Sequence, residues 1–557
     1  MKGVEFMSNI KKTGALVAHV LKNEGVKCIF GIPGGHIYPT IEEAEKLGMR
    51  FISTRHEMSA AFAAEGWALT TGTLGVCTGT AGPGVTNLLT GMANAYMGKY
   101  PVFYLGGRAR VTEFDRNELQ DFDQLSLVRS MSKYAKTVYE PDRVPEYVAQ
   151  AIAEAVNGTP GPAYIEVPRD LNDSTVDMDA IKMPAHSCKQ GRMPAADEDI
   201  KRAAQLIQQA ERPLIIAGSG LWWSQAQAEL QAFVEKTDIP FCTRNAARGA
   251  ISDKHTNYVS IGCNDPITIN VAQHSDLVII IGTRASYTLS RSVIRPETKM
   301  IRIDIDPAEL NNQWQPDVGI VGDAKMVLAQ LTDAAPEMEH AMWKQLVQQI
   351  KMQAAQGMSQ LCPDPLASPI NPIAFFEQLR QEIDENTIVV FDGGDVATWA
   401  AMLLPAYGPG QLLGIANNAF GPLGVGMGYA MAAKLAHPEK EVILLTGDGA
   451  MGYNIMEFDT CMRYGIKLTA IVFNDSMWGM IKRSESRKAP ETKDFPGLDL
   501  REETHYERVV EGLGGHGAYV TDIRALRAAI QEAKASDKPA CINVVVDPKI
   551  GPPAAGC

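Results

Sequence analysis

Short apolar runs alternate with longer amphipathic stretches along the whole chain. Runs such as Leu277–Ile281 and Val442–Leu445 are bounded by polar or glycine-rich segments, which is typical of strands buried on both faces of a parallel sheet. Longer stretches, such as Glu57–Leu69 and Val144–Ala155, have the apolar spacing of helices. The alternation of the two predicts an α/β fold whose central, mostly parallel sheets are flanked by helices.

The alternation falls into three blocks, which we interpret as domains covering residues 8–172, 196–333 and 372–549. A polar, irregular stretch separates the first two blocks. A charged helix, predicted over Glu337–Gln356, and a proline-rich segment separate the last two. The strands expected in the three blocks are Cys28–Phe30, Arg50–Ser53, Leu74–Cys77, Val102–Leu105 and Ala163–Val167; Pro213–Ala217, Asp276–Ile281 and Met300–Ile305; and Thr387–Phe391, Glu441–Leu445, Lys467–Phe473 and Ala540–Val546.

Composition narrows the class of protein. The 557 residues carry a formal net charge of −13, which argues against a general binder of nucleic acid or of anionic membranes. No apolar run approaches the roughly 20 residues that a membrane helix needs, and the N-terminus shows no secretory signal. The nine cysteines are scattered and form no CxxC pair, so we expect reduced, mostly buried thiols. These features predict a cytoplasmic protein with no nucleic-acid or membrane partner.

Two aspartates follow consecutive predicted strands of the third block. Asp448 stands in Gly447-Asp448-Gly449 after the run Val442–Leu445, and Asp475 follows Lys467–Phe473 after one predicted helix, Ala450–Tyr464. The carboxyl ends of parallel strands share one edge of the sheet, so the two carboxylates should lie side by side. They would suit Mg²⁺, and the N–H groups of Gly449 and Ala450 would suit a phosphate. A lone GDG is also a common tight turn; its spacing to Asn474-Asp475 is more specific.

The segment from Gly447 to Asp475 resembles the signature of thiamine diphosphate enzymes. The resemblance extends over essentially the whole chain to the group that contains acetolactate synthase, benzaldehyde lyase, oxalyl-CoA decarboxylase and 2-hydroxyacyl-CoA lyase. It implies thiamine diphosphate and Mg²⁺ as cofactors, with Asp448, Asp475 and the Met477 carbonyl as metal ligands. The family motif has Asn at position 475. Asp keeps an oxygen ligand and adds a negative charge, so we expect metal binding to survive.

Two segments of the first block match the family's pyrimidine site. In Arg55-His56-Glu57, Glu57 matches the glutamate that exchanges a proton with the aminopyrimidine and so activates the thiazolium carbon. A carboxylate at a helix start is also favourable by itself. Residues Gly82, Pro83 and Asn87 match the loop against which the pyrimidine packs. Glycine is reasonable there because backbone must closely approach a flat ring.

Two segments of the third block match cofactor-binding loops. The resemblance implies that the Gly421 carbonyl binds the 4′-amino group and that Leu423 forces the cofactor into its bent shape. Leu423 could equally be an ordinary core residue. Asp395 and Val396 match a second diphosphate-binding loop, which varies among relatives. In this family the two halves of the site come from different subunits, so the resemblance implies a homodimer and favours a homotetramer.

The residues expected near the substrate are less specific. His36, in the first strand–helix loop, resembles a histidine of benzaldehyde lyase that acts on substrate oxygen, and Gln120 matches a glutamine near the reacting centre. Trp478, Met480 and Ser484 are assigned to the substrate pocket. The basic run Lys482, Arg483, Arg487 and Lys488 is interpreted as a solvated helix face; if it faces the pocket instead, it favours an anionic substrate.

The reaction is therefore less defined than the cofactor. Our leading hypothesis is a lyase or carboligase that forms or cleaves 2-hydroxy ketones and aldehydes through a C2 enamine. The alternatives are acetolactate synthase-type decarboxylation of a 2-oxoacid with carboligation, and a 2-hydroxyacyl-CoA lyase or oxalyl-CoA decarboxylase. Gly218-Ser219-Gly220 in the middle block follows a predicted strand but is weak evidence for a nucleotide site, so FAD, ADP or CoA there stays open.

Overall fold

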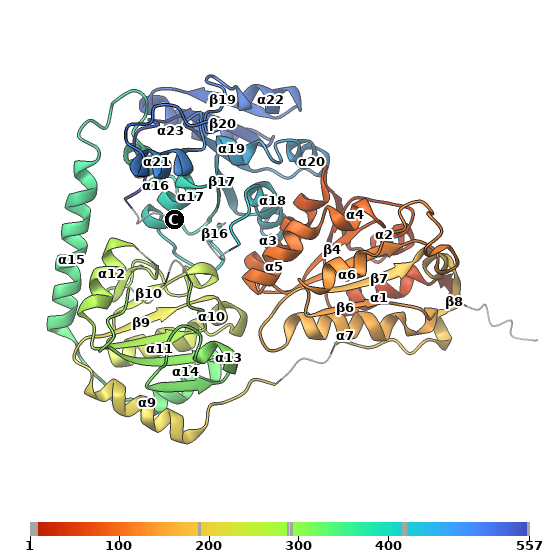
Figure 1. Ribbon diagram of the computed structural model, residues 1–557, viewed down its shortest axis with the longest axis horizontal. Coiled ribbons are helices and arrows are strands. Elements are labelled where there is room, and N and C mark those ends of the chain that lie inside the picture. The colour runs from red at the N-terminus through yellow and green to blue at the C-terminus, as the bar shows by residue number, and fades with distance from the viewer. Residues whose placement is uncertain are drawn as a thin grey trace, which may run out of the picture. The chain divides into compact units, whose positions relative to one another are not determined.

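The computed structural model describes residues 9–187, 191–263, 265–286, 289, 293–414 and 420–553. Three six-stranded parallel sheets are flanked by helices, as the alternation predicts (Figure 1). Contacts group the chain into two compact units. Unit 1 is Met1–Gln190 with Met427–Ala432 and Asp459–Tyr464, and unit 2 is Gly191–Gly426 with Ala433–Phe458 and Gly465–Cys557.

The first sheet lies in unit 1 and has the strand order β3-β2-β4-β5-β7-β6, with all pairs parallel. A short antiparallel pair, β1 with β8, lies apart from it. The strands are β1 (Ile10–Lys12), β2 (Cys28–Gly31), β3 (Arg50–Ser53), β4 (Gly75–Gly79), β5 (Val102–Arg108), β6 (Tyr134–Thr137), β7 (Ala163–Pro168) and β8 (Thr175–Asp177). The helices are α1 (Gly14–Asn23), α2 (Tyr38–Lys46), α3 (Glu57–Thr71), α4 (Pro83–Thr86), α5 (Leu89–Gly98), α6 (Gln124–Arg129), α7 (Val144–Val156) and α8 (Arg169–Asp173).

The second sheet lies in unit 2, with the parallel order β11-β10-β9-β12-β13-β14. Its strand β12 is buried on both faces: Leu277, Ile279 and Ile281 belong to one apolar core, and Val278 and Ile280 belong to another. The strands are β9 (Pro213–Ala217), β10 (Phe241–Thr243), β11 (Tyr258–Ile261), β12 (Leu277–Ile281), β13 (Lys299–Asp304) and β14 (Val318–Val321). The helices are α9 (Asp197–Gln209), α10 (Ser219–Ser224), α11 (Gln227–Thr237), α12 (Pro266–His274), α13 (Pro307–Leu310) and α14 (Ala324–Ala334).

The third sheet has the parallel order β16-β15-β17-β18-β20-β19. Because β17 is hydrogen-bonded to both β15 and β18, the loops that follow these three strands meet at one edge. The strands are β15 (Thr387–Asp392), β16 (Leu412–Gly414), β17 (Glu441–Gly447), β18 (Thr469–Asn474), β19 (His516–Val520) and β20 (Ala540–Val545). The helices are α16 (Pro372–Arg380), α17 (Asp395–Leu403), α18 (Val425–Ala436), α19 (Asp448–Met451), α20 (Glu457–Tyr464), α21 (Gly479–Lys488), α22 (Tyr506–Gly512) and α23 (Ile523–Ala535).

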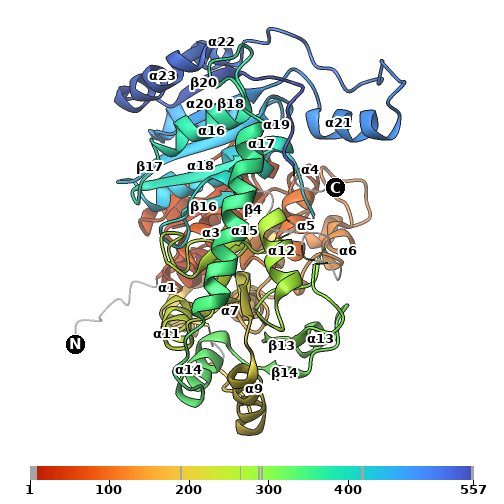
Figure 2. The same cartoon turned by 90° about the vertical axis from the view of Figure 1, so that its left-hand side faces the viewer.

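Two helix predictions are wrong in detail. The helix expected over Ala450–Tyr464 is two helices, α19 and α20, separated by a turn in which Tyr453 N–H bonds to the Ala450 carbonyl. The connecting helix α15 spans Ala341–Gln360 and not 337–356; in unit 2 it runs from the second sheet to the third (Figure 2). The Trp343 indole donates to the Pro213 carbonyl near one end of α15, whereas Met358, near the other end, packs against the apolar core of the third sheet.

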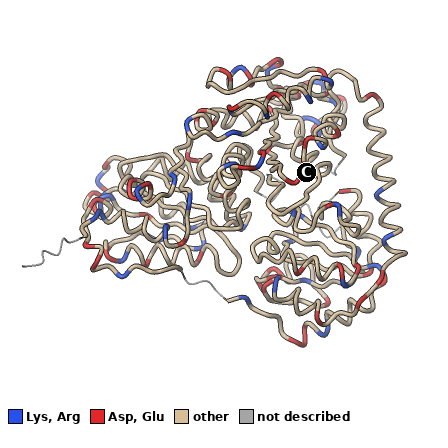
Figure 3. The backbone as a smooth tube through the Cα atoms, turned by 180° about the vertical axis from the view of Figure 1, so that it is seen from behind, with Lys and Arg blue, Asp and Glu red and all other residues tan. Residues whose placement is uncertain are grey.

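The chemical character of the chain agrees with its composition. Five of the seven described cysteines are buried. Acidic and basic residues are interspersed along the described backbone (Figure 3). Among the helices of the described residues, none is long and apolar enough to cross a membrane.

Candidate functional site

The predicted residues of unit 1 gather at the carboxyl ends of its adjacent parallel strands. Glu57 is the first residue of α3, the helix that follows β3 after a three-residue loop, and its exposed fraction is 8%. The Asn87 amide donates to Glu57 Oε2 over 3.0 Å. His56 caps the same helix, because its Nδ1 accepts from the Met58 N–H. The carboxylate is therefore buried, held by one side-chain donor and fixed on a capped helix.

His36 lies in the loop after β2 and is also buried. Its Nδ1 is 3.1 Å from the Thr80 hydroxyl, and its carbonyl accepts from the Asn172 amide. Burial, followed by the nearby charge of Arg169, lowers the pKa of His36. The imidazole is consequently neutral at pH 7, and Nδ1 is held by a residue of the neighbouring loop.

Gln120 and Gly82 are neighbours. Gly82 has φ of +63°, and a Cβ placed on it would lie 3.1 Å from both Cβ and the carbonyl oxygen of Gln120. Pro83 follows as the first residue of α4, whose last turn leads into Asn87. The segment after β4 thus contains both Asn87, which donates to Glu57, and Gly82, which lies next to Gln120.

A second glutamine, Gln124, is in closer contact with this loop than the sequence indicates. It is fully buried, and its Oε1 accepts from the Gly82 N–H over 2.9 Å. Its Nε2 donates to Glu166 Oε2 and to the Gly107 carbonyl. Arg108 pairs with the other oxygen of Glu166 over 2.9 Å. Gln124 and Gln120 stand in the same segment of the sequence. Only the fold shows that the Gln124 amide is buried and that Gln120 is half-exposed.

The structure brings Asp448 and Asp475 together at the ends of β17 and β18. The Ser476 N–H, in a left-handed turn with φ of +57°, donates to Asp448 Oδ2 over 2.7 Å. Burial raises the pKa of Asp448 to about 6. Burial and the charge of Asp448 raise the pKa of Asp475 to about 7. Met477 follows directly and pairs with Asp499 in an isolated bridge.

The loop after β15 adds a third carboxylate. Asp395 and Val396 begin α17, and the Asp395 side chain is 9% exposed. Arg483 of α21 forms ion pairs with both Asp395 and Asp475. The prediction of a solvated basic face is therefore wrong for Arg483, because the two carboxylates bury it; the neighbouring Arg487 is exposed, as expected.

Gly421 and Leu423 precede α18, in a loop that is anchored from two sides. Asp392, fully buried at the end of β15, accepts from the N–H groups of Gly424 and Gly426. The Asn454 amide donates to the Gly424 carbonyl. Burial raises the pKa of Asp392 to about 7, whereas these backbone donors oppose the rise. Asp392 was not among the predicted site residues, although it begins the segment that drew attention to Asp395.

The predicted pocket residues pack beside the same loops. A Cβ placed on Gly449 would lie 2.5 Å from the Trp478 ring, and one on Gly394 would lie 3.0 Å from Met480 Cβ. Ala450 is buried in α19, and Ser484 is half-buried on α21. The structure therefore brings Trp478 and Met480 to the glycine-rich loops, and it places Ser484 next to Arg483 in sequence.

The Gly218–Gly220 segment of the second sheet has a packing role. A Cβ on Gly218 would lie 2.3 Å from Thr283 Cβ, and one on Gly220 would lie 2.7 Å from Gly282 Cα. The loops after β9 and β12 therefore approach backbone to backbone, which explains both glycines without a nucleotide.

The donor set of the third sheet suits a divalent cation and a diphosphate. Asp448 and Asp475 offer hard oxygen ligands, which Mg²⁺ prefers. Glycines at 393, 394, 447 and 449 leave the surrounding backbone free of side chains, as a closely bound phosphate requires. In unit 1, the Glu57–Asn87 pair provides a buried carboxylate beside a glycine loop. Both groups of residues fit the cofactor that the sequence implies.

Comparisons with known proteins cover nearly the whole chain. Three family descriptions of the thiamine pyrophosphate enzymes match: the N-terminal TPP binding domain over residues 11–127, the central domain over 200–331 and the C-terminal TPP binding domain over 392–544. An acetolactate synthase large subunit of Mycobacterium tuberculosis is 33% identical over 97% of this chain and 96% of its own. A probable acetolactate synthase large subunit of Methanocaldococcus jannaschii is 32% identical, covering 96% and 92%. Human 2-hydroxyacyl-CoA lyase 2 is 30% identical, covering 97% and 90%.

Proposed function

This chain belongs to the thiamine pyrophosphate enzymes and uses this cofactor, and we propose that it is a Mg²⁺-dependent lyase or carboligase. The reaction forms or cleaves the C–C bond of a 2-hydroxy ketone or aldehyde. When bound, the cofactor would supply a carbon nucleophile and would stabilise the negative charge that develops on the substrate carbon to which it adds. The observation that carries the choice of reaction is His36, a buried neutral imidazole fixed by Thr80 in the loop after β2.

Two side chains of unit 1 handle protons in this proposal. Glu57 holds and releases a proton at its carboxylate, and Asn87 fixes the orientation of that carboxylate. Nε2 of His36 relays a proton to or from the substrate hydroxyl, while the contact with Thr80 occupies Nδ1. Gln120 contributes an amide near this point, and Gly82 and Pro83 form the backbone wall of the pyrimidine site.

The loops of the third sheet hold the other half of the cofactor. Asp448, Asp475 and the Met477 carbonyl are the proposed Mg²⁺ ligands. The backbone of Gly449 and Ala450, together with the loop at Asp395 and Val396, lies against the diphosphate. The Gly421 carbonyl would bind the pyrimidine amino group, and Leu423 would support the cofactor from the same loop. Asp392 keeps this last loop in place through two backbone amides.

The relatives favour two other reactions. Acetolactate synthases support decarboxylation of a 2-oxoacid followed by carboligation. 2-Hydroxyacyl-CoA lyase 2 supports cleavage of a CoA thioester substrate, and an oxalyl-CoA decarboxylase-like reaction belongs to the same alternative. Trp478, Met480 and Ser484 are the proposed pocket residues that select among these substrates.

The deciding experiment gives the holoenzyme either a 2-hydroxy ketone such as acetoin or the 2-oxoacid pyruvate. We expect aldehyde release from acetoin, read by mass spectrometry. CO₂ release from pyruvate without acetoin cleavage would replace our proposal by the acetolactate synthase-type reaction. Glu57→Gln should abolish turnover in either case, whereas Glu42→Gln, on the exposed face of α2, should not.

Four further points stay proposals, and the first two have direct tests. FAD in the middle domain would give the purified protein a flavin absorption spectrum. Assembly as a homodimer or homotetramer would be seen by analytical ultracentrifugation. We place the domains at residues 8–172, 196–333 and 372–549, and the enzyme in the cytoplasm.

A further inference from the structure

Arg483 occupies a buried position among carboxylates. Its Nη2 lies 3.1 Å from Asp475 Oδ2 and also pairs with Asp395, while Nη1 donates to the Pro548 carbonyl. The exposed fraction of its side chain is 18%, and that of each carboxylate is 9%. Arg483 thus connects α21 to the loops that follow β15, β18 and β20.

The backbone around this ion pair leaves room for it. A Cβ on Gly479 would lie 2.1 Å from Arg483 Nη2 and 2.2 Å from Asp475 Oδ2. A Cβ on Gly551 would lie 2.8 Å from both Cδ and Nε of Arg483. Glycine at two positions far apart in sequence therefore permits the guanidinium to reach the carboxylates.

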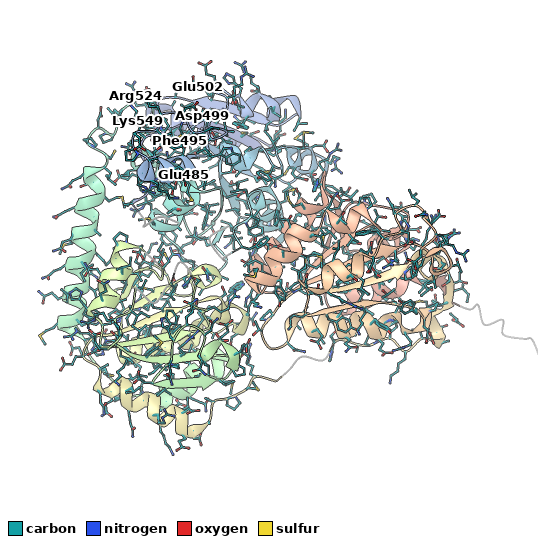
Figure 4. All side chains as sticks on the ribbon, viewed as in Figure 1. Glu485, Phe495, Asp499, Glu502, Arg524 and Lys549 are labelled. Atoms are coloured by element: carbon teal, nitrogen blue, oxygen red, sulfur yellow. The ribbon has the colours of Figure 1, made fainter. Side chains whose placement is uncertain are left out.

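Other basic residues of α21 have different surroundings. Lys482 pairs with the mostly exposed Asp499, and Lys488 pairs with Glu485 on its own helix. Glu485 and Asp499 are labelled in Figure 4. Arg483 is distinguished by its two buried carboxylate partners.

The negative charge of the surrounding loops explains why a cation is buried in contact with Asp475 and Asp395. Asp395, Asp448 and Asp475 bring three carboxyl groups, and when all are ionised three negative charges, to loops that are proposed to receive an anionic diphosphate. Asp475 stands where the family motif has an uncharged Asn. A guanidinium in contact with Asp475 offsets this added charge directly.

We propose that Arg483 is the internal counter-ion of Asp475 and Asp395, and that it competes with the divalent cation for Asp475. The second half of this inference rests on the proposed metal role of Asp448 and Asp475. Without metal, the guanidinium neutralises the extra carboxylates and stabilises the loops. When a cation binds, Nη2 gives up Asp475 Oδ2, while its contacts with Asp395 and Pro548 can persist.

The test uses the full-length protein, stripped of metal by a chelator, as wild type, Arg483→Gln, Asp475→Asn, the double variant and Arg487→Gln. Arg487→Gln is the matched control because it removes the same charge from an exposed position of the same helix. The readouts are Mn²⁺ binding by electron paramagnetic resonance, with saturating thiamine diphosphate, and the metal-free thermal midpoint.

We expect Arg483→Gln to tighten Mn²⁺ binding by about tenfold or more, since a unit positive charge is removed at contact distance from a partly buried site. Its metal-free midpoint should fall, and adding Asp475→Asn should recover much of that loss. Arg487→Gln should change neither readout appreciably.

The two parts of the inference fail separately. Additive midpoint shifts in the metal-free double variant would overturn the counter-ion assignment. Unchanged Mn²⁺ affinity in Arg483→Gln would overturn the competition. If the wild type bound no Mn²⁺ at all, both the proposed metal site and the proposed competition would be refuted. The thermal midpoints of the single and double variants without metal would still test the ion pair between Arg483 and Asp475.

Discussion

Glu65 is fully buried in the middle of α3. Its Oε2 accepts from the Tyr429 hydroxyl over 2.8 Å and from the Asn94 amide over 2.5 Å. Its Oε1 has no hydrogen-bond partner among the described residues. Burial raises the pKa of Glu65 well above its ordinary value, although the two donors oppose the rise. The folded carboxyl therefore keeps its proton to a higher pH than a solvent-exposed glutamate does. Glu65→Gln removes its titration while keeping an oxygen for both donors.

The sign of the effect follows from proton linkage. Above the ordinary glutamate value of 4.5, the unfolded chain releases this proton and the folded protein keeps it. The folded state then binds more protons, so the free energy of unfolding falls by about 1.4 kcal/mol per pH unit until the buried carboxyl itself titrates. The glutamine side chain does not titrate, so the free energy of unfolding of Glu65→Gln does not fall with pH for this reason. From pH 5 upward the variant should therefore gain stability relative to wild type, by about 1.4 kcal/mol for each pH unit over which the folded carboxyl stays protonated.

The assay is denaturant unfolding of the full-length protein at fixed ionic strength across that pH range. Glu140→Gln, at an exposed position of unit 1, is the matched control and should follow the wild type. If the Glu65→Gln and wild-type stabilities ran parallel with pH, the carboxyl would not be protonated in the folded protein and the reasoning would be refuted.

Three other substitutions test separate contacts. Asn87→Ala removes the donor to Glu57, and we expect kcat to fall by about tenfold to a hundredfold with little change in the thermal midpoint, because a hydrogen bond to a charged group is worth about 1.5–3 kcal/mol; unchanged kinetics would contradict a positioning role. Gly428→Val should cost about 3 kcal/mol in denaturant unfolding, because even a Cβ would lie 2.7 Å from Phe62 Cβ; a wild-type midpoint would show that the two segments can separate. Asp392→Ala leaves two glycine amides unpaired, so the thermal midpoint should fall and thiamine diphosphate should bind more weakly by calorimetry; normal affinity would remove Asp392 from the support of the cofactor loop.

Much of the fold followed from local patterns. Five-residue apolar runs such as Leu277–Ile281 have both faces buried, and that requirement is visible in composition alone. The spacing between Asp448 and Asp475 predicted their proximity because one strand–helix–strand unit separates them, and consecutive parallel strands of this kind pair directly here.

Other features could not be predicted from local patterns. Apolar spacing continues through the turn between α19 and α20, so periodicity alone merged the two helices. Gln120 and Gln124 are equally polar in sequence, and only the approach of β7 gives Gln124 a buried partner in Glu166.

By itself, the sequence determined the α/β class, the order of the strands along the chain and the motif that identifies the family, because each depends on short stretches of residues. The tertiary structure decided which charges are neutralised. Arg483 appeared to be one of four basic residues on a solvated helix, but two carboxylates from distant strand ends surround it. Its partners lie in loops 8 and 88 positions away in the sequence. The order of the strands in the sheet brings these loops together, and a local pattern of polar and apolar residues does not reveal that order.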